Sequence, residues 1–159
     1  MTQTSAGVRA GLLAACQTVF AAVTDTSGAP VAVTNGPPGN YQPQEIVAVG
    51  MATRQPVTRP TMGLSRSRER ETEVDIVFSV FVPGTEVAQT TANDECDRLV
   101  DLFEAYIRTA PHEQLGGACR DSFVSNITGP TPELVVSQSG SITGRVAEST
   151  VTVTAFIRY

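Results

Sequence analysis

Residues 74–82 have a hydrophobic side chain at every second position, beginning with Val74. This two-residue period is typical of a β-strand with one face turned to a core. The positions on that face are Val74, Ile76, Phe78, Val80 and Val82. Because Val77 and Phe81 make the second face half apolar, we expect part of it to be covered by another element or by a neighbouring subunit.

Two segments have hydrophobic residues at the helical spacing of three and four. Residues 6–24 are predicted to form one helix, and Ser5 is placed to cap its start. Residues 88–110 are predicted to form the other helix, whose apolar stripe includes Cys96, Leu99 and Phe103. Its opposite side is acidic and carries Asp94, Glu95, Asp97, Asp101 and Glu104.

Shorter apolar runs between Gly- and Pro-rich stretches predict the remaining strands. Strands are expected at 31–34 and 45–51, with a stiff turn of Asn35, Gly36, Pro37, Pro38 and Gly39 between them. Three more strands are expected at 120–128, 133–139 and 145–158, with corners at residues 129–132 and 140–144. The last run places Val151, Val153, Ala155 and Ile157 on one face and Thr150, Thr152, Thr154 and Phe156 on a wetter face.

The order of these elements predicts an α+β fold in a single domain of residues 1–159. We expect a mostly antiparallel sheet of about five to six strands with two helices packed on one face. A long Arg-rich loop or hairpin is expected between the second and third strands. Arg9 and Gln17 interrupt the Ala-rich N-terminal run, which also lacks the basic start of a signal peptide, so we expect neither export nor a membrane span.

Charge is distributed unevenly along the chain, whose formal net charge is −5. Residues 52–70 hold five arginines and one glutamate, so this segment carries +4 and the rest carries −9. The five arginines are Arg54, Arg59, Arg66, Arg68 and Arg70. An acidic body argues against a sequence-independent nucleic-acid binder, which would need a broad basic face.

The Arg-rich segment has two interpretations, a solvated loop and a functional arm. Alternation would place Arg66, Arg68 and Arg70 on one side of an extended strand, where they could pair with carboxylates of another chain. The acidic helix offers such carboxylates at Asp94, Asp97 and Asp101. An arm of one copy that reached this helix in the next copy would make a contact that closes into a ring.

Candidates for catalysis or metal binding are few. His112 is the single histidine and follows a helix, where a solvated loop residue is the simplest interpretation. Asp94 and Asp97 are three residues apart on an exposed helical face, which favours a solvated surface over a metal site. Cys16 and Cys96 fall on apolar stripes and are expected to be buried free thiols in a reducing cytosol, and Cys119 is expected to be reduced. We therefore predict neither an enzyme nor a cofactor.

Several segments of the sequence resemble segments of the tail terminator proteins of long-tailed bacteriophages. They are VRAGLLAAC, VTNGPPGNYQPQEIVAVG, ETEVDIVFSVFVPG, ANDECDRLVDLFEAYIRTA and TVTVTAFIRY, of which the GPP turn followed by VAVG is the most specific. The resemblance implies a virion protein of the tail and neck, assembled in the bacterial cytoplasm, that forms a hexameric ring and stops polymerisation of the tail tube. Its implied partners are the tube protein and the head-side neck protein, and DNA would pass through the ring without sequence-specific binding.

Two other functions remain open on the sequence. One is a head-completion or neck adaptor subunit, which also forms a ring around a channel. The other is a small cytosolic enzyme or ligand-binding domain acting through His112 and the acidic helix. A deep polar pocket around His112 would favour the latter.

Overall fold

The computed structural model describes residues 3–37, 44–58 and 69–158, and the side chains of all of these except 54–58 and 142. Two long helices, a short 3₁₀ helix and five strands follow one another along the chain. They are α1 (Ser5–Phe20), β1 (Ala32–Asn35), β2 (Glu45–Thr58), β3 (Glu69–Pro83), α2 (Glu86–Arg108), η1 (His112–Gly117), β4 (Asp121–Val136) and β5 (Ile142–Arg158).

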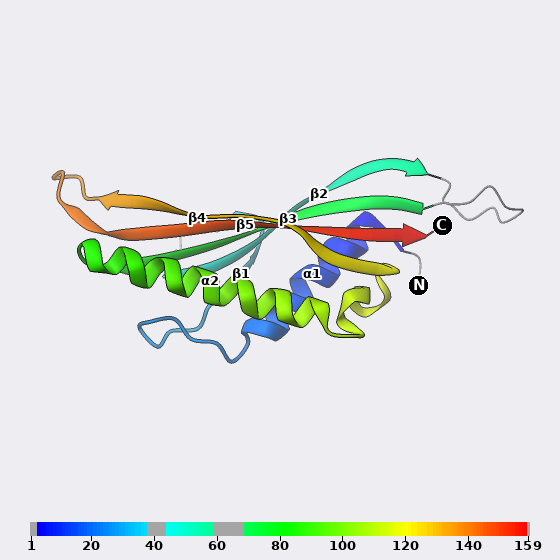
Figure 1. Ribbon diagram of the computed structural model, residues 1–159, viewed down its shortest axis with the longest axis horizontal. Coiled ribbons are helices and arrows are strands. Elements are labelled where there is room, and N and C mark those ends of the chain that lie inside the picture. Colours follow the sequence, from blue (N-terminus) through cyan, green and yellow to red (C-terminus); the bar gives the residue numbers. More distant parts are fainter. Residues whose placement is uncertain (1–2, 38–43, 59–68, 159) are drawn as a thin grey trace, which may run out of the picture.

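The five strands form one sheet in the order β1-β2-β3-β5-β4. Only the β1–β2 pair is parallel, and the other three pairs are antiparallel. Both long helices lie on the same face of this sheet, while the opposite face carries no described element (Figure 1). The predicted α+β fold, with a mostly antiparallel sheet and two helices on one face, is therefore confirmed.

The core lies between the helices and the sheet. Phe78 of β3 is fully buried and contacts Phe20 of α1 and Phe103 of α2, with ring centroids 6.2 and 5.9 Å away. α1 packs mainly on β1 and β2, whereas α2 packs on β3, β5 and β4. Apolar residues at the helical spacing thus bury their stripes against the apolar positions of the strands, as the sequence pattern predicted.

The start and end of α1 differ from the prediction. Thr4, not Ser5, is the N-cap, because its hydroxyl accepts a hydrogen bond from the backbone N–H of Gly7 at 3.0 Å. The Ser5 hydroxyl is buried instead and bonds the hydroxyl of Thr72 on β3 at 3.1 Å. The helix also ends at Phe20, before the predicted residue 24, and the chain then turns toward β1.

The predicted stiff turn after residue 34 does not make a hairpin, since β1 and β2 run parallel. Parallel neighbours require the chain to cross back to the starting end of the first strand. Residues 38–43 of this connection lie outside the described part of the chain.

The Arg-rich segment is flanked by longer strands than predicted. β2 continues to Thr58, β3 begins at Glu69, and Thr58 pairs with Glu69. The expected strand bounds of 45–51 and 74–82 are therefore too short at the ends that flank this segment, because ladder hydrogen bonds with the neighbouring strand hold even polar residues in a sheet. The middle of the segment, residues 59–68, is not described.

β4 is one strand of 16 residues and not two strands with a corner at 129–132. Its pairing with β5 continues past this stretch, with an irregular register between Thr128 and Thr131 and a cis peptide bond before Pro130. β4 lies at the edge of the sheet. Proline is tolerated there because its missing N–H can face away from the neighbouring strand.

Candidate assembly surface

The helix-free face of the sheet, called the open face below, mixes charged, hydroxyl and apolar side chains. On β3 the residues of this face alternate with the buried ones and pair with the corresponding residues of β5. They are Glu69, Glu71, Glu73, Asp75, Val77, Ser79 and Phe81 on β3, opposite Arg158, Phe156, Thr154, Thr152, Thr150, Glu148 and Val146 on β5. Ile46 and Ala48 of β2 extend the apolar part beside Ser79 and Val77.

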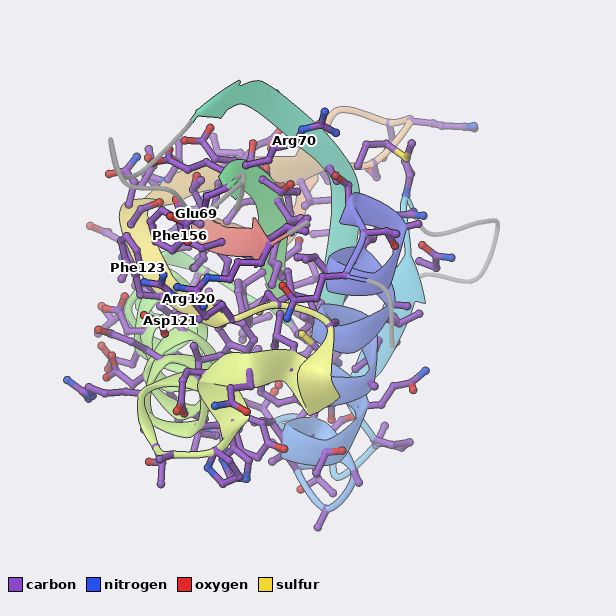
Figure 2. All side chains as sticks on the ribbon, turned by 90° about the vertical axis from the view of Figure 1, so that its right-hand side faces the viewer. Glu69, Arg70, Arg120, Asp121, Phe123 and Phe156 are labelled. Carbon is purple, nitrogen blue, oxygen red and sulfur yellow. The ribbon has the colours of Figure 1, made fainter. Side chains whose placement is uncertain are left out.

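An aromatic and charged cluster lies at the end of the open face where β5 finishes (Figure 2). The rings of Phe123 on β4 and Phe156 on β5 stack with centroids 6.0 Å apart. Beside them, Arg120 forms an ion pair with Glu69 at 3.1 Å, and its backbone N–H donates to the carbonyl of Phe156. Phe123 remains 45% exposed, so the cluster presents an aromatic surface to solvent.

Hydroxyl groups occupy the middle of the open face. The Thr152 hydroxyl donates to the carboxylate of Asp75 at 2.7 Å across the β3–β5 pair. The Thr154 hydroxyl donates to the hydroxyl of Ser125 on β4 at 2.8 Å. These bonds join side chains of neighbouring strands across the sheet, and Thr154 is itself buried among its neighbours.

β4 adds exposed apolar side chains along the edge of the sheet. Four of the seven large hydrophobic residues that are exposed in the described part of the chain lie on this strand: Phe123, Ile127, Leu134 and Val136. An edge strand also presents backbone hydrogen-bonding groups that have no neighbouring strand. Exposed apolar groups next to such an edge are typical of protein contact surfaces.

The predicted arginines are only partly placed. Arg54 lies on β2 and Arg70 on β3, whereas Arg59, Arg66 and Arg68 lie outside the described residues. Arg70 is half-buried and shares the helix side of β3 with Thr72, whereas its neighbours Glu69 and Glu71 belong to the open face. Arg70 is therefore part of the folded sheet rather than of an extended arm.

The three predicted carboxylates on α2 lie together. Asp94, Asp97 and Asp101 are exposed and line a surface hollow with Arg98, Leu102 and Ala105. This exposed acidic side confirms the expected solvated face. Within the described ranges, no group of three or more His, Cys, Asp or Glu side chains has a metal-binding arrangement.

His112 sits in η1 beside a hollow of about 430 Å³ between α1, the end of α2 and η1. Its ring stacks on Tyr106 with centroids 3.8 Å apart, and Nδ1 lies 3.1 Å from the carbonyl oxygen of Tyr106. Glycine, alanine and leucine make up much of the lining, which includes no Asp, Glu, Cys or Ser among the residues that the structure describes. The hollow therefore gives His112 no acidic partner for proton transfer.

All three cysteines are buried free thiols, which confirms the expectation for Cys16 and Cys96. Burial raises the pKa of Cys16 to about 12 and that of Cys119 to about 11. Burial also raises the pKa of Cys96. These thiols stay protonated at neutral pH, and a protonated thiol is a poor nucleophile or metal ligand.

The aromatic and charged cluster of the open face does not follow from the sequence pattern. Phe156 lies on the predicted wetter face of the last strand, where the only signal is an aromatic residue among threonines. Phe123 could not be linked to Phe156, because only the pairing of β4 with β5 brings them together.

Comparison with known proteins does not assign the chain to a family. No protein-family model and no curated protein matches it. In the parts of the chain that the structure describes, no helix has the length and apolar character needed to cross a membrane.

Proposed function

We propose that this protein is a tail terminator of long-tailed bacteriophages. In this role six copies form a ring on the end of the tail tube, stop its polymerisation, and provide the surface that joins the tail to the head-side neck. The partners are the tube protein, the neck protein and other copies of this chain. The DNA passes through the ring without sequence-specific binding, and the protein works by assembly, not by catalysis.

The observation that carries this proposal is the open face of the sheet. The sequence predicts that the half-apolar second face of β3 is covered by another element or by a neighbouring subunit. Among the described residues no element of the chain covers it (Figure 1), so this face is available for contact with a neighbouring subunit. The exposed Phe123, stacked on the half-buried Phe156, is the kind of aromatic residue that is enriched at protein interfaces.

Charge supplies the second contact in the proposed ring. In the proposed ring, the arginines of residues 54–68 meet the exposed carboxylates Asp94, Asp97 and Asp101 on α2 of the next copy. Such a contact joins two different surfaces, so repetition around an axis closes it into a ring. Arginine suits this role because its planar guanidinium pairs with a carboxylate through two parallel hydrogen bonds.

The direct test is the mass of the protein alone and in the presence of tube ends. A subunit of 16.8 kDa gives a hexamer of about 100 kDa. Free subunits that are monomeric but form six-membered rings on tubes would also support the proposal. A protein that remains monomeric on tube ends would contradict it, and twelve copies bound on the head side would identify a neck adaptor instead.

Charge exchange tests the proposed contact between copies. Asp97→Arg with Asp101→Arg should reduce ring formation at least about tenfold, because like charges then face the arginine segment. Adding Arg66→Asp and Arg68→Asp in the same chain should restore rings, since each contact again joins opposite charges. Arg108→Asp, an exposed change on the same helix, is the matched control. If all these variants form rings as the wild type does, the proposed charged contact between copies is wrong.

The hollow beside His112 supports a second candidate, a ligand-binding domain. Its volume of about 430 Å³ suits a small molecule. A small-molecule screen monitored by NMR would test this candidate. Chemical shift changes at Tyr106, His112 and Leu115 that disappear in His112→Ala would support it, and a screen without such changes would remove it.

A further inference from the structure

Glu45 is a buried carboxyl group at the first position of β2. Its side chain is 0% exposed, and it faces the helix layer, because its partner in the register is the buried Val80 of β3. Within the described structure neither carboxylate oxygen of Glu45 receives a hydrogen bond from a donor group. A buried carboxylate without donors is strongly unfavourable, so the neutral acid is favoured at this position.

The charged groups that face Glu45 come from two other segments. α2 contributes Glu95 and Arg98, and the connection between α1 and β1 contributes Asp25. Arg98 already binds Glu95 at 2.7 Å through Nη2, which also donates to the carbonyl of Thr24 at 3.2 Å. The guanidinium nearest to Glu45 is therefore already paired with Glu95.

Asp25 cannot take the proton as readily as Glu45. One of its oxygens accepts hydrogen bonds from the N–H and hydroxyl of Ser27 and from the N–H of Ala29, at 2.6 to 3.0 Å. These bonds lower its pKa below the ordinary value even though burial acts in the opposite direction. Asp25 stays ionised and adds to the negative field at Glu45.

Burial is the largest cause that raises the pKa of Glu45 to about 8, followed by the influence of the Glu95 carboxylate. Arg98 acts in the opposite direction, and Asp25 adds a smaller upward effect. Near neutral pH, Glu45 is therefore largely protonated and can donate its proton in a hydrogen bond to the Glu95 carboxylate.

We propose that Glu45 is a proton-controlled latch, in which the protonated carboxyl holds α2 against the start of β2 and the segment Thr24–Pro30, and loss of the proton loosens this junction. The proton leaves to water, and two adjacent carboxylates then repel each other. The ionised Glu45 also competes for Arg98, which is drawn away from the carbonyl of Thr24.

This inference is independent of ring formation and goes beyond the proposed function. The segment Thr24–Pro30 is held by a bridge between those two residues and by the bond from Asp25 N–H to the carbonyl of Ala29 at 2.7 Å. It leads directly into β1, so loosening it frees the edge of the sheet at β1 while the rest of the core remains packed.

Carboxyl carbon NMR of the wild-type protein tests the protonation state. Between pH 4 and 10, one glutamate should titrate near pH 8, and its signal should be absent in Glu45→Gln. Glu95→Gln should move that titration to lower pH, because it removes a neighbouring negative charge. If every carboxyl group titrates below pH 6, the latch does not exist.

Hydrogen exchange tests the loosening. The amides of residues 24–31 should lose protection about tenfold between pH 7 and pH 9 after correction for intrinsic exchange, and Glu45→Gln should abolish this loss. Glu104→Gln, on the same helix, is the matched control and should behave as the wild type. An equal loss of amide protection in Glu45→Gln would overturn the proposal. If that variant does not fold, the proposal is tested by the titration of the wild-type protein and by the shift of that titration in Glu95→Gln.

Discussion

The two faces of the sheet are made by the same strands but have opposite properties. On β3, Val74, Ile76 and Phe78 are fully buried under the helices. Asp75, Val77 and Ser79, which alternate with them, lie on the open face and are exposed or half-buried. The buried residues of the helix face therefore contribute most of the stability. The side chains of the open face are available for contacts outside the subunit.

The aromatic residues show the same difference. Phe78 touches rings from both helices, whereas Phe123 and Phe156 mainly stack on each other at the surface. When a buried aromatic ring is truncated to alanine, the residues on every side of it lose contacts. A ring on a surface leaves space that water fills.

Truncating one aromatic residue on each face should give the largest contrast. Phe78→Ala should lower the free energy of unfolding by about 3–5 kcal/mol, because it leaves a cavity between α1, α2 and β3. Phe123→Ala should lower it by about 1 kcal/mol and should weaken ring formation. Urea denaturation of the two purified variants measures both losses, and equal losses would contradict the assignment of stability to the helix face.

The pH dependence of stability should also differ between the two faces. Carboxyl groups occur on both faces, but the buried Glu45 belongs to the helix face. Glu45 has a raised pKa, so its stabilising effect is complete below its ordinary value near 4.5 and disappears as pH rises through about 8. The wild-type protein should therefore lose free energy of unfolding between pH 5 and pH 9 that Glu45→Gln does not lose. The difference in free energy of unfolding between the variant and the wild type should change by about 2–4 kcal/mol in favour of the variant over this range.

Glu73→Gln on the open face is the matched control for this measurement. Its half-buried side chain is on the opposite side of the sheet from Glu45. Chemical denaturation at several pH values should show that the free energy of unfolding of this variant changes with pH nearly as that of the wild type does. A wild-type protein that loses no stability above pH 5 would contradict a neutral Glu45.

The smallest effect is expected for the hydroxyl groups of the open face. Thr152→Val removes the hydrogen bond to Asp75 but keeps a β-branched side chain, so it should cost about 1 kcal/mol or less. Asp75→Asn should behave similarly, because an amide oxygen can still accept this bond. Thermal denaturation measures both, and a loss as large as that of Phe78→Ala would show that the open face is part of the core.

Part of the candidate surface could be predicted from the sequence. The acidic side of α2 with Asp94, Asp97 and Asp101 follows from helical spacing, and the structure places these residues on an exposed surface. The Phe123–Phe156 stack and the ion pair between Glu69 and Arg120 could not be predicted, because each joins residues that are distant in the chain. The burial of Glu45 was equally hidden, since a charged residue at the start of a strand is usually exposed.

Local hydrophobic periods predict the central parts of the two long helices and of most strands, together with the faces that are apolar. The strand around residues 74–82 and the helix around 88–110 follow from local periods of two and 3.6 residues, which report burial on one side. Tertiary structure alone decided the parallel pairing of β1 with β2, the continuity of β4 through Pro130 and Pro132, and the site at which Glu45 is enclosed. These features depend on the pairing and packing of residues far apart in the chain, and a local pattern of hydrophobic residues carries no information about such partners.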